Sequence, residues 1–185
     1  MKFEQTSIPG VVVIEPSVHG DSRGWFLESW HGPRYAQQGI PANFVQDNHS
    51  CSSRGTLRGL HAQSPGWQGK LVRCVVGAVW DVAVDVRVGS PSFGQHVAVE
   101  LSAENFRQIW LPPGLLHGFC ILGEAAEIIY KCTELYAPDA DFSVRWNDPE
   151  LGVPWPLDDP VLSPKDANAP LLREVRERLI PYVPA

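Results

Sequence analysis

Short runs in which apolar residues alternate with other residues, bounded by glycine or proline, most strongly limit how this chain can fold. The clearest run is Asp81 to Val88, where four valines at every second position share one face. His96 to Leu101 alternates in the same way, and Leu71 to Val76 and Glu127 to Thr133 are further candidate strands. The 16 glycines and 17 prolines are spread along the chain and predict tight turns between these runs. Numerous short strands joined by such turns predict an all-β barrel or jelly roll.

Helical patterns are scarce. Leucine and valine recur at helical spacing between Pro170 and Leu179, which predicts one C-terminal helix with Asn168 as its cap. A shorter turn is expected through Ser102 to Asn105. The 185 residues are enough for one well-filled core and few for two, so we expect a single domain spanning residues 1–185.

Charge and cysteine usage exclude several classes of protein. The net charge is −6 and no run of lysine and arginine exceeds two residues, so nucleic acid is not an expected partner. No stretch has the length and apolarity of a membrane span, and the first ten residues do not read as a signal peptide. The cysteines show no C-x-x-C pair, and three of them lie in apolar runs, where a free thiol behaves as a small hydrophobic group. A reduced, cytoplasmic protein is therefore expected.

The stretch RGLHAQ, Arg58 to Gln63, is the first candidate for chemistry, with Lys70 a few residues further on. A strict two-residue period places Arg58 and His61 on opposite faces of a strand, so both can serve one pocket only if the backbone bulges near Gly59. By themselves these residues favour a simpler interpretation, in which His61 is hydrogen-bonded in a core and Arg58 is a surface charge.

The stretch PPGLLHGF contains Pro112, Gly114 and His117 at a spacing that resembles the second conserved motif of the cupin superfamily. In metal-binding cupins, the first motif adds H-x-H and a glutamate to this histidine. Here the matching position reads His61-Ala62-Gln63, and no glutamate follows within a few residues. Glutamine is a poor ligand for a first-row metal, so no metal is expected, and a metal-dependent cupin enzyme is kept as a competing class.

Two polar stretches offer groups that could bind a ligand. Gln46, Asp47 and Asn48 in FVQDNHSCSSRG can exchange hydrogen bonds with a sugar or a pyrimidine base, although the stretch by itself favours an ordinary polar turn. Arg23 and Glu28 flank GWF, and an arginine with aromatic neighbours can hold a phosphate and shelter a base. A surface ion pair on an edge strand is the alternative.

Two further motifs have both a structural and a chemical interpretation. Tyr130 in AEIIYKC falls on the apolar face of its run. It is either a core tyrosine or a proton donor. In LSPKD, Ser163 and Asp166 have the spacing of a helix start with a capping box. The functional alternative directs Asp166 to orient His61 and Lys165 to a phosphate.

Taken together, these motifs closely resemble the dTDP-4-dehydrorhamnose 3,5-epimerase family. The matching segments run in order from about Ile8 to Leu172 and include DSRGWFLES, FVQDNHS, RGLHAQ, QGKLVRCVVG, LPPGLLHGF, YKCTELYAP, WNDPELGVPWP and LSPKD. The resemblance implies a cupin double-stranded β-helix (jelly roll) with a few short, mainly C-terminal helices. It also implies a homodimer with no metal or organic cofactor. The implied reaction is epimerisation at C3 and C5 of a dTDP-linked 4-keto-6-deoxy sugar, in dTDP-L-rhamnose biosynthesis.

The same resemblance implies a role for each matching residue. His61 corresponds to the catalytic base and Asp166 to its orienting partner, while Lys70 faces the sugar C4 oxygen and Tyr130 is the acid on the opposite face. The expected substrate-binding residues, with Asp47 added from its polar stretch, are Arg23, Glu28, Gln46, Asp47, Asn48, Arg58, His117 and Lys165. In this family the first two tend to come from the neighbouring subunit.

Three departures from the family pattern stand out. Ala62 replaces the usual aromatic residue of RGLHxQ, and the loop SPGW before Gln68 is about a residue short. Asp141-Phe142 stands where a substrate-contacting glutamate and a glycine are common, so that contact is not carried over. Relatives that epimerise only one carbon keep the same pair of catalytic residues and are the alternative within the enzyme class. A non-catalytic sugar-nucleotide-binding cupin is the third class.

Overall fold

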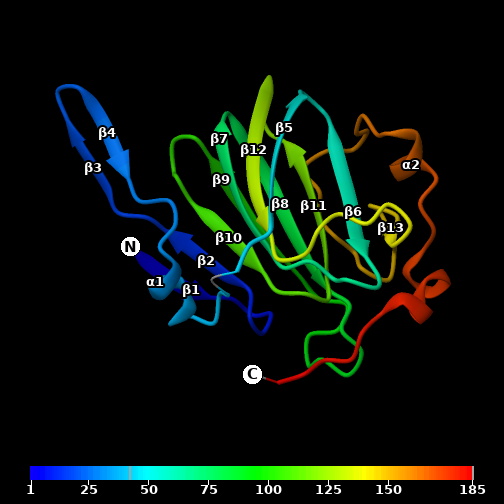
Figure 1. The fold of residues 1–185 in the computed structure, drawn as a ribbon. Coiled ribbons are helices and arrows are strands. Elements are labelled where there is room, and N and C mark those ends of the chain that lie inside the picture. Colours follow the sequence, from blue (N-terminus) through cyan, green and yellow to red (C-terminus); the bar gives the residue numbers. More distant parts are fainter. Residues whose placement is uncertain (42, 185) are drawn as a thin grey trace.

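The computed structural model describes residues 1–41 and 43–184, and two antiparallel sheets face each other across most of this part of the chain (Figure 1). The larger sheet has the strand order β1 (Lys2–Gln5), β2 (Val12–Glu15), β10 (Gln108–Leu111), β7 (Lys70–Val76), β12 (Ala125–Cys132), β5 (Gln46–Ser53). The smaller sheet has the order β13 (Asp141–Ser143), β6 (Leu57–Gln63), β11 (Leu115–Ile121), β8 (Ala78–Asp85), β9 (His96–Ser102). The predicted all-β jelly roll is confirmed.

Alternation along the strands divides the apolar residues between three clusters. One fills the space between the sheets and includes Val72, Ile109 and Ile128. A second, which includes Val82 and Val84, packs the outer face of the smaller sheet against the C-terminal segment. The third lies on the outer face of the larger sheet under the segment around α1 (Gly32–Ala36). Because a strand turns alternate side chains to opposite faces, β7 and β8 each contribute to two of these clusters.

The strands expected from the alternating runs are present, with small shifts at their ends. His96 to Leu101 and Leu71 to Val76 are each extended by one residue in β9 and β7. The run that begins at Asp81 forms β8 instead over Ala78–Asp85, three residues earlier than predicted. It stops at Asp85 because the carboxylate of this residue binds Arg87, Ser90 and Ser92, which turns the chain back toward β9.

The predicted C-terminal helix from Pro170 to Leu179 is wrong. Two 3-10 turns, η1 (Leu172–Glu174) and η2 (Arg176–Arg178), occupy this segment. Val175 between them has a φ of −126°, which is not helical. The recurring apolar residues pack on the smaller sheet without forming a continuous helix, and Asp148 accepts a hydrogen bond from the Leu172 amide (2.6 Å). Asn168 does not cap this segment, because it ends the preceding helix α2 (Pro164–Ala167) instead.

A two-stranded hairpin of β3 (Val18–Asp21) and β4 (Gly24–Leu27) projects away from both sheets (Figure 1). Its aromatic residues Trp25 and Phe26 are 62% and 70% exposed. Among the described residues, no helix is long and apolar enough to cross a membrane.

Candidate active site

Two adjoining cavities lie between strands of the larger and the smaller sheet. The inner cavity, of about 140 Å³, is lined by Ser50, Arg58, His61, Lys70, His117, Gly118, Phe119 and Tyr130. The outer cavity, of about 190 Å³, is lined by His61, Ala62, Gln63, Gln68, Lys70, Tyr130, Tyr136, Asp141 and Lys165. His61, Lys70 and Tyr130 line both, so the expected base, the expected partner of the C4 oxygen and the expected acid lie where the cavities meet.

His61 is held by a carboxylate 105 residues away in the sequence. Its Nε2 lies 2.5 Å from Asp166 Oδ1, and the Asp166 side chain is only 3% exposed. Burial opposes ionisation of this carboxyl group, but hydrogen bonds from His61 and Ser163 outweigh it and lower the pKa of Asp166 below its ordinary value. Asp166 is therefore ionised at neutral pH. It accepts the Nε2 proton of the neutral ring, so the lone pair of that ring is on Nδ1.

A bulge in β6 brings Arg58 and His61 to the same cavity. On β11, His117 and Phe119 are two residues apart, but they pair with His61 and Arg58, which are three residues apart. Gly59 lies in the bulge, between Arg58 and His61, and has a φ of 127°. A Cβ added to it would lie 2.6 Å from the Gly118 backbone. A glycine is therefore required there, and the bulge expected near Gly59 is confirmed.

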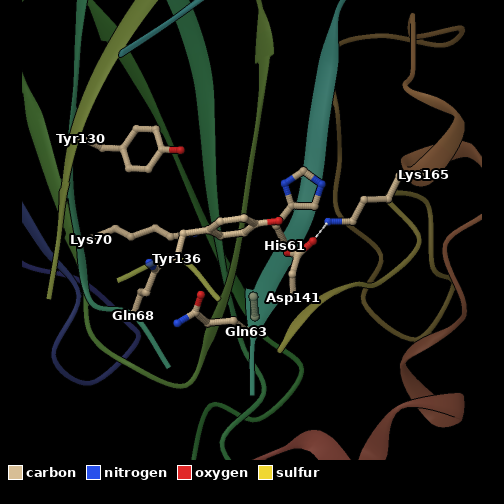
Figure 2. A pocket seen from close by; sticks show the side chains of 9 residues that line it. His61, Gln63, Gln68, Lys70, Tyr130, Tyr136, Asp141 and Lys165 are labelled. Carbon is tan, nitrogen blue, oxygen red and sulfur yellow. Dashed lines mark hydrogen bonds and ion pairs between the residues drawn. The ribbon is translucent and has the colours of Figure 1, made fainter. Parts of the chain in front are cut away.

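Lys70 and Tyr130 reach the cavity from the larger sheet, opposite His61 on the smaller one (Figure 2). Lys70 lies on the same inward face of β7 as buried Val72. Tyr130 lies on the same inward face of β12 as buried Ile128. Burial lowers the pKa of the Lys70 ammonium, against the opposing charges of nearby acidic groups. Burial also raises the pKa of Tyr130, so its phenol keeps its proton at neutral pH.

The inner cavity contains a second histidine–carboxylate pair. His117 Nε2 lies 2.9 Å from Asp81 Oδ2, and both side chains are almost fully buried. On the neighbouring strands, Arg58 Nε donates to the buried Ser52 hydroxyl (2.9 Å). Asp81 holds the His117 ring and Ser52 holds the Arg58 guanidinium, and both residues line the inner cavity.

The outer cavity is bordered by an ion pair between Lys165, on α2, and Asp141, on β13 (Figure 2). Tyr136, from the loop after β12, is half exposed and lines the same cavity. Lys165, an expected substrate-binding residue, therefore lines the outer cavity. Asp141, which is not among the expected binding residues, lines it as well.

Gln63, at the position of a metal ligand in the related metal-binding motif, is occupied in holding two loops together. Its Nε2 donates to the carbonyl oxygens of Gly66 (2.5 Å) and Leu135 (3.0 Å), and its Oε1 accepts from the Ala137 amide (3.2 Å). Both ends of the amide are therefore engaged by the backbone of these loops. In the described part of the chain, no cluster of three or more histidine, cysteine or acidic residues could hold a metal ion.

The polar stretch that begins at Gln46 is a strand, β5, and its alternation separates the predicted binding residues. Gln46, Asn48 and Ser50 are half-buried on the inner face, where Gln46 accepts a hydrogen bond from the Tyr136 amide (2.8 Å). Asp47 points to the outer face and pairs there with Lys131. The structure therefore does not bring Asp47 to either cavity, because adjacent residues of a strand face opposite sides.

Arg23 and Glu28 also lie away from the two cavities within this chain. Arg23, at the turn of the projecting hairpin, pairs with Asp21 (2.6 Å), and Glu28 pairs with Arg34 (2.5 Å). The hairpin leads away from the sheets (Figure 1), and neither Arg23 nor Glu28 lines either of the two cavities in this chain.

These features define a cupin-fold protein whose polar cavities are lined by ionisable side chains. A family model for dTDP-4-dehydrorhamnose 3,5-epimerase matches residues 5–174. The chain is 54% identical over 168 residues to the dTDP-4-dehydrorhamnose 3,5-epimerase of Pseudomonas aeruginosa, covering 90% of this chain and 93% of that protein. It is 41% identical over 179 residues to a dTDP-4-dehydrorhamnose 3-epimerase of Streptomyces niveus, covering 96% and 86%.

Solved structures agree with the sequence comparisons. The crystal structure of dTDP-6-deoxy-D-glucose-3,5-epimerase from Legionella pneumophila, in complex with dTDP-4-keto-L-rhamnose, superposes with a TM-score of 0.95. It is 50% identical and covers 98% of both chains. The chain belongs to the dTDP-4-dehydrorhamnose 3,5-epimerase family.

Proposed function

We propose that this chain epimerises C3 and C5 of dTDP-4-dehydro-6-deoxy-D-glucose, giving dTDP-4-dehydro-L-rhamnose for dTDP-L-rhamnose biosynthesis. The observation that carries the proposal is the placement of a carboxylate-held histidine opposite a tyrosine and a lysine across one cavity. Relatives with this activity are about half identical to the chain over nearly their whole length, which supports the same substrate here.

Removal of a proton next to a ketone needs a base and a group that stabilises charge on the carbonyl oxygen. His61 is the proposed base, because Asp166 engages Nε2 and leaves the lone pair on Nδ1. Asp166 also stabilises the imidazolium that forms when the proton is taken. Lys70 is the proposed partner of the C4 oxygen, where its ammonium hydrogen-bonds to the developing enolate.

Inversion requires that the new proton arrive from the face opposite to the one that lost it. Tyr130 projects from the larger sheet and His61 from the smaller one, so a sugar between them has one group on each face. Because burial raises the pKa of Tyr130, the phenol is in the donor form at neutral pH. Return of the proton by His61 would only regenerate the substrate.

The remaining polar and charged groups suit the diphosphate and the sugar hydroxyls. Arg58 and His117 line the inner cavity and Lys165 the outer one, so we assign them to substrate binding, with Gln46 and Asn48 beside them on β5. Asp47 is left out of this assignment because it lies on the other face. No metal or organic cofactor is part of the proposed reaction, and residues 1–185 are proposed to act as one domain. The four free thiols favour a cytoplasmic location.

We also propose a homodimer in which the hairpin of each chain completes the site of its partner with Arg23 and Glu28. Two largely exposed aromatic residues on a projecting hairpin support this, because such groups usually mark an interface. Co-expression of Arg23→Ala and His61→Asn chains tests it. If the hairpin acts across the dimer, the mixed dimer has one intact site and regains activity that neither variant has alone. No recovery would place Arg23 and His61 in the same chain's site.

Solvent deuterium measures the number of carbons epimerised. Incubation with dTDP-4-dehydro-6-deoxy-D-glucose in D2O should place deuterium at both C3 and C5 of the product, and His61→Asn should abolish incorporation at both. Label at one carbon only would replace the proposal with a mono-epimerase, the activity named for the Streptomyces niveus relative. No label with either protein would contradict both forms of the proposal.

A further inference from the structure

We propose that Ser163 is a positioning residue of the active site, which fixes the Asp166 carboxylate and so sets the proton affinity of His61. The proposal builds on the catalytic role proposed above for His61 and Asp166. It concerns the residue on the far side of the carboxylate, which does not touch either cavity.

The two oxygens of Asp166 have separate partners. Oδ1 lies 2.5 Å from His61 Nε2, and Oδ2 accepts a hydrogen bond from the Ser163 hydroxyl at 2.8 Å. With one contact on each oxygen, the plane of the carboxylate cannot rotate without losing one of them. The side chain is 3% exposed, so water cannot readily replace a lost contact. The serine therefore holds Oδ1 in place for the imidazole.

Ser163 has a second role, which uses a different part of its hydroxyl group. Its oxygen accepts a hydrogen bond from the Asp166 amide at 3.1 Å and so caps α2, the single turn that supplies both Lys165 and Asp166. Capping uses a lone pair of the oxygen, whereas positioning of the carboxylate uses the proton. A capping role alone would be served as well by a side chain that accepts but does not donate.

The turn that holds Ser163 is itself tightly constrained. Pro164 occupies the first helical position, and the Ala167 amide donates to the Ser163 carbonyl oxygen (2.9 Å). Asn168 closes the other end by donating to the Pro164 carbonyl oxygen (2.7 Å). Asn168 contacts neither His61 nor the carboxylate, so it offers a matched control for changes that loosen the turn.

Four variants separate the two roles of the hydroxyl. Ser163→Thr keeps both the lone pair and the proton. Ser163→Asp keeps the cap, since aspartate caps helices as well as serine does, but has no proton for Asp166 and adds a like charge. Ser163→Gly removes the hydroxyl, and glycine is itself a well-tolerated residue at the N-cap position. Asn168→Ala loosens the same turn and leaves the carboxylate contact in place.

The measurements are the pH profile of kcat/KM and the NMR titration of the His61 ring, which does not depend on turnover. Without the serine proton the carboxylate binds the imidazolium more strongly. We therefore expect the acidic limb and the His61 midpoint to rise by about one pH unit in Ser163→Gly, and further in Ser163→Asp. Ser163→Thr should restore the wild-type values, and Asn168→Ala should not shift them.

Wild-type values in both Ser163→Gly and Ser163→Asp would overturn the proposal and leave Ser163 a helix cap only. The proposal also fails if Asn168→Ala shifts the His61 midpoint as much as these two variants do. A shifted midpoint in a protein that shows no turnover of the keto sugar would keep the positioning role and reject the proposed reaction instead.

Discussion

Substitution of Asp166 by asparagine tests the proposed base most directly. Asparagine has nearly the same shape, but it carries no charge and has one acceptor oxygen where the carboxylate has two. That oxygen can accept a hydrogen bond from His61 or from the Ser163 hydroxyl. The Asp166 carboxylate accepts both hydrogen bonds at the same time, one on each oxygen (2.5 and 2.8 Å). The variant therefore removes the charge that stabilises the imidazolium and leaves the tautomer of His61 unfixed.

The size of the effect follows from the geometry of the pair. The charge centres of an imidazolium and a carboxylate in this contact are about 4 Å apart, which corresponds to about 4 kcal/mol at an effective dielectric constant of about 20. His61 is 30% exposed, so solvent screens part of this interaction. A loss of about 3 kcal/mol in transition-state stabilisation remains, and kcat should fall by about two powers of ten.

The assay is steady-state kinetics together with deuterium exchange at C3 and C5 of the substrate. Asp141→Asn is the matched control, because it removes a carboxylate at the same cavity that pairs with Lys165 and not with His61. We expect Asp166→Asn to lower kcat and the exchange rate alike, and Asp141→Asn to act mainly on KM. An Asp166→Asn enzyme within about threefold of wild type would refute the reasoning, since a charge interaction of this size would then be absent.

Three further variants test the other groups. Lys70→Met should lower kcat about a thousandfold. It should also raise the unfolding midpoint at neutral pH in thermal denaturation, because the folded state lowers the pKa of this buried ammonium. Between the folded-state pKa of Lys70 and its unfolded-state pKa of about 10.4, the unfolded protein binds more protons. The free energy of unfolding of the wild type therefore rises with pH in this range, and Lys70→Met should lose that rise. Tyr130→Phe should lower product formation about a hundredfold while exchange on the His61 face persists, measured as the ratio of labelled substrate to product. Gln63→Glu cannot donate to Gly66 and Leu135, so the free energy of unfolding in urea should fall by about 2 kcal/mol; an unchanged value would mean that water replaces both contacts.

The fold could be predicted from the sequence because alternation in a strand is a local signal. Val97, Val99 and Leu101 share a face in the sequence pattern, and they pack on the same cluster in the structure. The error at Pro170 to Leu179 has the same origin. A few apolar residues spaced for one buried face fit two 3-10 turns as well as a helix, and local spacing cannot distinguish them when the contact with Asp148 decides the backbone.

The candidate site is harder to predict from the sequence, because the residues that contact each other at its centre are far apart along the chain. No local pattern connects His61 with Asp166, 105 residues later, or His117 with Asp81. The family resemblance supplied the first pair. The second was missed, although Asp81 lies on the less apolar face of a strand that is otherwise rich in valine. A buried acid on such a face needs a partner, and that requirement was the available signal.

Gln63 has a structural role that its sequence motif does not indicate. The motif only predicts that a glutamine replaces a metal ligand, whereas in the structure the amide bonds to the loops that carry Gly66, Leu135 and Ala137. The same three contacts fix the wall of the outer cavity next to Tyr136. The side chain at this position therefore helps to shape the pocket. In the proposed reaction, the positive charge that stabilises the enolate comes instead from Lys70. That assignment gives a role to an ammonium at a position where desolvation disfavours its charge.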